Sequence, residues 1–201
     1  MHKDIYPSAA LAAYIKDLFD HYNQEALLYH NYAHTSRVAF HAKEIAEHYL
    51  LDDRSKFIME AAAWFHDTGQ LNGDMATHEE RSVEFMREYF AGKINDPALL
   101  NTIADCIMAT KMPSSPNDLL QEIICDADTY HLGTKDFQQL DPLVWKELEL
   151  RIHKPVENKL QKSLLFLEQH QFFTSYCQEV LTVGKNKNIA YLEKIIQDGS
   201  S

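Results

Sequence analysis

Apolar residues recur along this chain every three or four positions, the spacing that gathers them on one face of an α-helix. The clearest of these runs cover residues 11–22, 38–49, 57–65, 83–90 and 99–107. No alternating run of β-branched residues is long enough to predict a strand. The pattern therefore predicts an all-α protein, and we expect one helical domain over residues 1–201.

Prolines and glycines predict where several helices begin or end. Three pairs have the form of an N-cap residue followed by proline at the first helical position. These pairs are Asp96-Pro97, Ser115-Pro116 and Asp141-Pro142. Pro155 predicts a kink or break in the long helical pattern over residues 143–172, and Gly184 divides the last helical stretch. Only the tail of residues 198–201 is expected to be disordered.

The composition is typical of a globular protein, with 201 residues, 45% hydrophobic and 24% charged. No apolar stretch approaches the roughly 20 residues that a membrane span needs. The apolar residues 9–15 follow Asp4 and Pro7 and lead into an amphipathic pattern, so we expect no signal peptide. These features favour a cytoplasmic enzyme that does not bind a membrane.

The cysteines bear on disulfide formation, and the net charge bears on the class of partner. Cys106, Cys125 and Cys177 are odd in number and far apart, so we expect reduced, buried thiols rather than disulfides. The formal net charge is −11, and no basic patch stands out in the sequence. Such a chain repels the phosphate backbone of nucleic acids, which argues against a nucleic-acid partner.

Two histidines and two aspartates are the candidate chemistry of the chain. His34 opens one predicted helix, His66-Asp67 ends the apolar run before Gly69, and a further aspartate lies near position 128. Imidazole and carboxylate groups together suit a divalent metal. Neighbours on a helix diverge by about 100°, but a helix that ends at Thr68-Gly69 lets both His66 and Asp67 turn inward. The sequence therefore predicts a metal site.

Other histidines of the chain have a simpler interpretation. His34, His41 and His48 lie seven residues apart, on one face of one predicted helix. Such a stripe can be a half-buried polar seam, and we favour that structural role for His41 and His48.

Three segments resemble motifs of the small HD-domain metal-dependent phosphohydrolases. Residues 29–38 resemble their opening motif, Trp64-Phe65-His66-Asp67 their central motif, and residues 123–133 the segment with the last ligand. The resemblance covers about residues 25–135 well and continues more weakly over 174–192. It implies an HD-type helical fold with a metal-site core at about 25–135 and C-terminal helices at 141–198. It also implies His34, His66 and Asp67 as metal ligands.

The last ligand is an aspartate of the segment Cys125-Asp126-Ala127-Asp128. The two carboxylates point to different sides of a helix, so only one should reach the metal. The family's ligand usually follows a small residue, which favours Asp128 over Asp126. The other aspartate would then be an acceptor for a metal-bound histidine or a surface charge.

Candidates for phosphate binding and proton transfer are less sharply defined. Arg37 lies three residues after His34 and could clamp a phosphate with its planar guanidinium, or form a surface ion pair. Lys111 is a second candidate cation. Residues 77–82 resemble a family segment with a glutamate before a serine, so Glu79 or Glu80 could act as general acid or orient water.

Residues 77–82 also allow a purely structural interpretation. Thr77 followed by Glu80 has the spacing of a capping box at a helix start. Many relatives carry a charged residue three or four positions after the central aspartate, where this chain has Gln70 and Leu71. That difference argues against the guanosine-tetraphosphate hydrolases of the family and leaves the proton donor open.

The histidine count bears on the number of metals. Two-metal members, including oxygenases, resemble a pattern with two more histidines between the central pair and the last aspartate, whereas this chain has only His78 there. We therefore expect one divalent ion, which can be manganese, iron, nickel, zinc or magnesium. The resemblance implies hydrolysis of a nucleotide or another small phosphate ester, with Asp67 facing the attacking water. The alternative is a regulatory metal- or nucleotide-binding protein, and the oligomeric state stays open.

Overall fold

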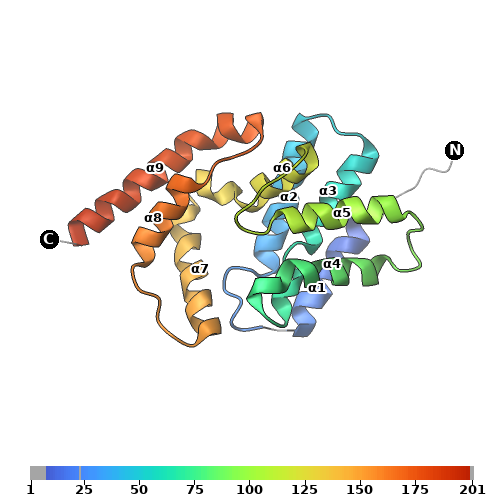
Figure 1. Ribbon diagram of the computed structural model, residues 1–201, viewed down its shortest axis with the longest axis horizontal. Coiled ribbons are helices and arrows are strands. Elements are labelled where there is room, and N and C mark those ends of the chain that lie inside the picture. The colour runs from blue at the N-terminus through green and yellow to red at the C-terminus, as the bar shows by residue number, and fades with distance from the viewer. Residues whose placement is uncertain (1–7, 23, 200–201) are drawn as a thin grey trace. The chain divides into compact units, whose positions relative to one another are not determined.

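Helices dominate the computed structural model, which describes residues 8–22 and 24–199 and has no strand within them (Figure 1). This confirms the all-α prediction. By their contacts the residues fall into two compact units, one of residues 1–24 and 30–128 and the other of residues 25–29 and 129–201. The expected single domain over 1–201 stays a prediction.

The first unit is built around helix α3 (Asp53–Phe65), which contacts its other α-helices. These are α1 (Ser8–Tyr22), α2 (Tyr32–His48), α4 (His78–Phe90), α5 (Pro97–Ala109) and α6 (Leu119–Asp128). Every residue from Ala61 to Phe65 is buried, as expected for a helix surrounded by others. The end of α3 therefore delivers the next two residues, His66 and Asp67, to the interior of the unit.

Two of the predicted helix starts lie in this unit, and one is correct. Asp96 caps α5, and its carboxylate accepts a hydrogen bond from the Leu99 amide at 3.0 Å. Ser115-Pro116 does not begin α6. Asp118 stands directly before that helix and accepts from the Gln121 amide at 3.0 Å, so the nearer carboxylate takes the capping role.

The third predicted start, at Asp141-Pro142 in the second unit, is wrong. Helix α7 (Phe137–Ile152) begins earlier and contains Pro142. Asp141 instead accepts hydrogen bonds from the Ser163 hydroxyl at 2.7 and 2.8 Å. Proline near the start of a helix removes a single backbone hydrogen bond, which this side-chain contact between helices helps to offset. The break predicted at Pro155 is confirmed, since α8 (Lys159–Gln169) begins seven residues after α7 ends.

The last helix, α9 (Ser175–Gly199), runs through Gly184 without a break, contrary to the prediction. A Cβ atom at Gly184 would lie 1.8 Å from the carbonyl oxygen of Gly133, so this glycine allows close packing rather than a turn. Asp198 and Gly199 belong to α9, so the predicted disorder is wrong for them. Residues 200 and 201 lie outside the described residues.

A short segment that precedes α2 belongs to the second unit. Residues 25–29 pack there, with Leu27 and Tyr29 buried. The backbone N–H of Tyr29 donates to the buried carboxylate of Glu147 at 2.8 Å, and Arg151 lies 3.5 Å from the same carboxylate. This contact anchors the segment on α7.

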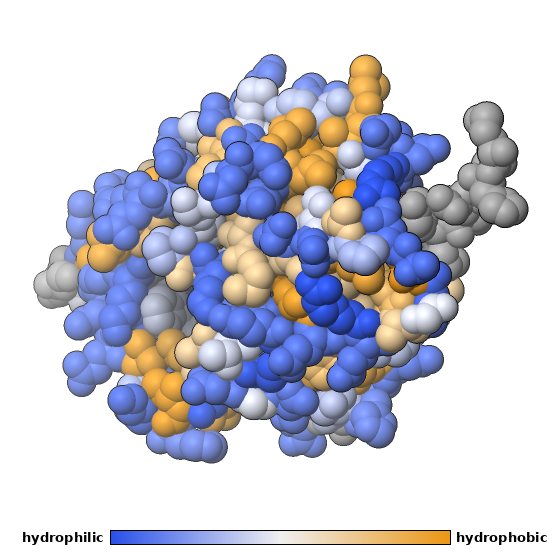
Figure 2. All heavy atoms as spheres, turned by 45° about the vertical axis from the view of Figure 1, so that its right-hand side comes forward, coloured by the Kyte–Doolittle hydropathy of each residue, from blue (hydrophilic) through white to orange (hydrophobic). Residues whose placement is uncertain are grey.

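The surface is largely hydrophilic on the face that Figure 2 shows, with apolar residues in small patches. All three cysteines are buried, as predicted. Among residues 8–22 and 24–199, no helix combines the length and the apolar character that crossing a lipid bilayer requires.

Candidate metal centre

His34 lies in the first turn of α2, and a local cap fixes its backbone. The Asn31 side chain accepts hydrogen bonds from the amides of Ala33 and His34, at 3.0 and 3.2 Å. Thr35 adds a bond from its hydroxyl to the Asn31 carbonyl oxygen at 3.3 Å. The imidazole of His34 is thereby directed into the unit, where only 2% of the residue is exposed.

The His66-Asp67 pair lies where α3 gives way to a 3-10 turn. The α-helix ends at Phe65, earlier than the sequence suggested, and the turn η1 spans Thr68–Leu71. Asp67 therefore has a backbone conformation (φ −109°, ψ 4°) outside the α-helix, and its side chain is freed from the helical direction. The expectation that a helix end brings both neighbours to one point is met, although Gly69 lies inside η1 and not after it.

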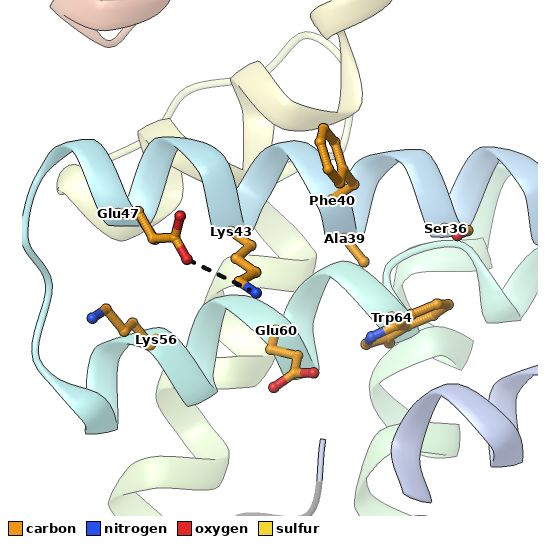
Figure 3. A pocket seen from close by; sticks show the side chains of 9 residues that line it. Ser36, Ala39, Phe40, Lys43, Glu47, Lys56, Glu60 and Trp64 are labelled. Carbon is orange, nitrogen blue, oxygen red and sulfur yellow. Dashed lines mark ion pairs between the residues drawn. The ribbon is translucent and has the colours of Figure 1, made fainter. Parts of the chain in front are cut away.

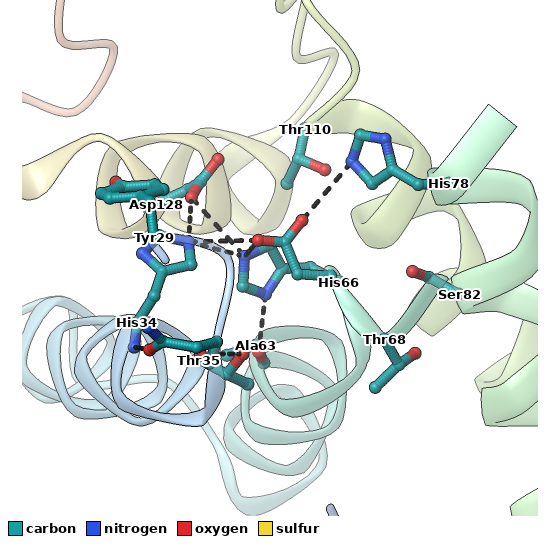
Figure 4. A network of polar contacts seen from close by, with 12 residues as sticks. Tyr29, His34, Thr35, Ala63, His66, Thr68, His78, Ser82, Thr110 and Asp128 are labelled. Carbon is teal, nitrogen blue, oxygen red and sulfur yellow. Dashed lines mark hydrogen bonds and ion pairs between the residues drawn. The ribbon is translucent and has the colours of Figure 1, made fainter. Parts of the chain in front are cut away.

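Four side chains converge in the interior of the first unit (Figure 4). Nε2 of His34 lies 3.3 Å from Nε2 of His66. Asp128 Oδ1 lies 3.1 and 3.5 Å from these two nitrogens, and Asp67 Oδ2 lies 3.2 and 3.3 Å from them. The ligand atoms of His34, His66 and Asp128 are all within 4.8 Å of one another.

The orientation of these groups suits a metal ion. His66 Nδ1 donates to the Ala63 carbonyl oxygen at 2.8 Å, so the lone pair of its neutral ring lies on Nε2, which faces the cluster. Asp67 Oδ2 is buried, and although it has ion-pair distances to both histidines, it forms no hydrogen bond with a described residue. A buried carboxylate oxygen beside two imidazole nitrogens is a donor set for a divalent cation.

The histidines and carboxylates of the cluster shift one another's pKa. Burial lowers the pKa of His34 and His66, but Asp128 and Asp67 outweigh it, so both pKa values lie above the ordinary histidine value. Burial raises the pKa of Asp67 and Asp128, but the histidines outweigh it and hold both below the ordinary aspartate value. A bound cation would compete with protons for the same histidine nitrogens.

The structure separates the two aspartates of the last motif. Asp128 ends α6 and points its carboxylate at the two histidines. Asp126 is fully buried in α6, whereas Asp128 is partly exposed, but Asp126 is not part of the group of ligand atoms. The geometry therefore favours Asp128 as the last ligand, as the small residue before it suggested.

His78 is the residue that the sequence analysis undervalued. It begins α4, and its Nε2 lies 3.4 Å from Asp67 Oδ1, while its Nδ1 donates to the Met75 carbonyl oxygen at 2.8 Å. The next residue, Glu79, is buried, and its Oε2 has no hydrogen bond to a described residue. The available signal was that His78 is the sole histidine between the central pair and Asp128.

The other candidates lie around α4 and α2. Lys111 pairs with Glu80 at 2.6 Å, so its charge is compensated by that carboxylate. Thr77 is the N-cap residue of α4, as the structural interpretation of residues 77–82 expected, but its side chain makes no capping bond, so the capping box does not form. Arg37 is half-exposed on α2, three residues after His34, and forms no ion pair with a described residue. Of the two candidate cations, Arg37 is therefore the one that no described carboxylate compensates.

A separate hollow of about 360 Å³ lies between α2 and α3 (Figure 3). Trp64 lies across from Ser36 and Ala39, and Lys43, which pairs with Glu47 at 3.9 Å, also lines the hollow. The four residues of the cluster do not line it. Lys43 is therefore a cation on α2 that lines this hollow and not the candidate metal centre.

Comparison with known proteins agrees with this site and fold. The HD-domain family model matches residues 31–133, more than half of the chain. A search of curated proteins finds no match. The chain is also similar to a solved structure described as a predicted HD superfamily hydrolase from an uncultured Thermotogales bacterium. The two are 17% identical with a TM-score of 0.59, covering 94% of this chain and 91% of the other, so this likeness shows the fold. The matched segment contains His34, His66, Asp67 and Asp128, and the chain belongs to the HD-domain family.

Proposed function

We propose that this protein is a metal-dependent phosphohydrolase that acts on a nucleotide or another small phosphate ester. The observation that carries the proposal is the convergence of three buried groups, His34, His66 and Asp67, with the partly exposed Asp128. The His66 lone pair and the buried Asp67 Oδ2 face one point. Membership of the HD-domain family supports the hydrolase class. The substrate class rests on the resemblance of the motifs.

His34, His66, Asp67 and Asp128 would hold one divalent ion. When bound, such an ion lowers the pKa of water and polarises a phosphoryl oxygen. The second oxygen of Asp67, Oδ1, lies 3.4 Å from His78 Nε2. The Asp67 carboxylate could therefore bind an ion through Oδ2 and orient the His78 ring through Oδ1. Glu79 is buried, its Oε2 lies 3.4 Å from His78 Nδ1 without a hydrogen bond to a described residue, and it is the candidate general acid.

Arg37 would supply the positive charge that holds a phosphate ester at the site. The net charge of −11 repels a phosphate ester, so a local cation is needed to hold it. A guanidinium binds phosphate oxygens in a planar fork. Since Lys111 is compensated by Glu80, we assign the phosphate contact to Arg37. A cytoplasmic location is consistent with this role and is part of the proposal.

The experiment that tests the function measures phosphate release by the metal-loaded protein over a panel of nucleotides and small phosphate esters. We expect turnover of at least one compound, about one tightly bound ion per chain, loss of activity with a chelator and recovery with a divalent metal. Tight binding of a compound without turnover would favour a regulatory binding protein. Two tightly bound ions per chain would contradict the one-metal site and favour oxygen chemistry.

Exchanging each aspartate of α6 for asparagine tests the choice of the last ligand. Asp128→Asn should abolish tight metal binding, because a neutral amide replaces a carboxylate that faces both histidines. Asp126→Asn should reduce metal affinity by no more than about 10- to 100-fold, the usual cost of losing a group outside the ligand set. Titration calorimetry measures both affinities. If Asp126→Asn empties the site and Asp128→Asn does not, the ligand is Asp126.

Replacing Arg37 by methionine tests the phosphate contact. Arg37→Met keeps a long side chain on α2 but removes the guanidinium, so KM should rise about 10-fold or more while kcat changes little. Lys43→Met removes a charge from the same helix at the separate hollow and should leave KM unchanged. Steady-state kinetics on the best substrate decide the matter. Equal effects of the two substitutions would mean that Arg37 acts only through net charge.

A further inference from the structure

Gly69 packs directly against the start of α4. It follows the His66-Asp67 pair by two residues, and a Cβ atom there would lie 1.9 Å from the His78 carbonyl oxygen and 2.9 Å from the Ser82 amide nitrogen. Gly69 is not one of the glycines with positive φ. The absence of a side chain at this position therefore serves a close approach of two backbones.

Both polar groups of Gly69 are held by side chains of α4. Its N–H donates to the Ser82 hydroxyl at 2.8 Å, and Ser82 is fully buried. Its carbonyl oxygen accepts from Arg81, with Nε at 3.1 Å and Nη2 at 2.9 Å. We call Gly69, Arg81 and Ser82 the Gly69 clamp. Two consecutive residues of one helix thus fix a single residue of η1 from both sides.

The remaining contacts of Arg81 extend the clamp along the loop before α4. Its Nη1 donates to the Thr77 hydroxyl at 2.6 Å, and its Nη2 also donates to the Asp74 carbonyl oxygen. This bond engages the hydroxyl of Thr77, the N-cap residue of α4, which makes no side-chain capping bond itself. The rigid planar fork of a guanidinium suits such a set of acceptors better than a flexible ammonium does.

The clamp lies between two residues of the candidate centre. Asp67 precedes Gly69 by two residues, and its carbonyl oxygen accepts from the Gln70 amide at 2.9 Å. His78 begins α4, and its Nε2 lies 3.4 Å from Asp67 Oδ1. Holding Gly69 against α4 therefore sets the separation between the Asp67 carboxylate and the His78 ring.

We propose that Arg81 and Ser82 are positioning residues that act through Gly69 to hold Asp67 in its binding geometry. Neither side chain belongs to the four converging groups. The consequence for metal binding rests on the proposed function, whereas the ordering of η1 does not. Metal-ligand geometry is sensitive to such outer contacts, whose loss typically costs about 10- to 100-fold in affinity.

Hydrogen exchange of the metal-free protein tests the ordering. The informative group is the Gln70 amide, because its acceptor, the Asp67 carbonyl oxygen, is untouched by both substitutions. Ser82→Ala and Arg81→Met should each accelerate exchange at Gln70 by about 10-fold or more. Ile103→Val, a buried substitution on α5, is the control for a general loss of stability. Ile103→Val should accelerate exchange at Gln70 only as much as its loss of global stability, measured by the melting temperature, predicts.

Titration of the same variants with Mn²⁺ tests the positioning. Ser82→Ala and Arg81→Met should weaken Mn²⁺ binding about 10- to 100-fold, while Ile103→Val should leave the affinity unchanged. Arg81→Lys, which restores one donor but not the fork, should recover part of the loss. The double variant should lose less than the product of the single effects, because both side chains act on one residue.

Each outcome decides a different claim. Unchanged exchange at Gln70 in both variants would overturn the inference, whatever the metal affinities are. Faster exchange with Mn²⁺ affinities equal to that of Ile103→Val would also overturn it, since the clamp would then order η1 without positioning Asp67. If the wild type binds no divalent metal at all, the proposed function fails, and the exchange result alone decides whether the clamp holds Asp67.

Discussion

His66→Gln should lose tight metal binding and reduce turnover by more than the roughly 10- to 100-fold that losing an outer contact of a ligand costs. The amide is close to imidazole in size but is a much weaker ligand for divalent transition metals. The ring that it replaces presents its lone pair to the cluster, because its other nitrogen donates to Ala63. Metal analysis and phosphate release measure the effect, and circular dichroism should show unchanged helicity.

His41→Gln is the matched control for this substitution. His41 lies seven residues after His34 on α2 and pairs with Glu44 at 2.9 Å, outside the four converging groups. The variant should bind metal and turn over substrate like the wild type. Full metal binding by His66→Gln would remove this histidine from the ligand set and, with it, the main support for the proposed centre.

Gly184→Ala should destabilise the second unit strongly. The added methyl would lie 1.8 Å from the Gly133 carbonyl oxygen. No rotamer change relieves this contact, because the backbone fixes the position of a Cβ atom and its partner is a backbone oxygen. Forcing extra volume into packed structure typically costs about 1–3 kcal/mol, and occasionally more. Urea denaturation followed by circular dichroism should show the loss as a lower midpoint.

Gly199→Ala provides the comparison at the end of the same helix. An added Cβ there meets nothing within 4 Å, so stability should be unchanged or slightly higher, by less than about 1 kcal/mol. A Gly184→Ala protein as stable as Gly199→Ala would show that the backbones of α9 and η3 (Tyr130–Gly133) are not in close contact.

The helices of the first unit could be predicted because each carries its own signal. Periodic apolar residues mark the buried faces, and Asp96 is an N-cap whose partner, the Leu99 amide, lies three residues away. The convergence of His34, His66 and Asp128 could be predicted only through the resemblance of three motifs. Spacing alone does not bring residues from α2, α3 and α6 together.

The incorrect predictions share a physical cause. From the sequence Gly184 resembles a helix breaker, but in the structure it packs against Gly133, 51 residues earlier in the chain. Pro142 looks like a helix start until Ser163 engages the neighbouring Asp141. Thr77 is the N-cap residue of α4 as expected, but its hydroxyl accepts from Arg81 and makes no capping bond. In each case a contact from another element overrides a local preference, and a periodicity analysis contains no information about such contacts.

The segment 25–29 has a consequence for how this protein can be truncated. Because it packs with residues 129–201 although it precedes α2, the chain passes from one unit to the other three times. A fragment that stops after Asp128 would retain every converging side chain but lose Glu147, the acceptor for Tyr29. Two apolar residues, Leu27 and Tyr29, would then lose their cover just before His34. Truncation at a single position therefore does not give the metal-binding unit with all of its contacts. We expect that an expression fragment has to include both units.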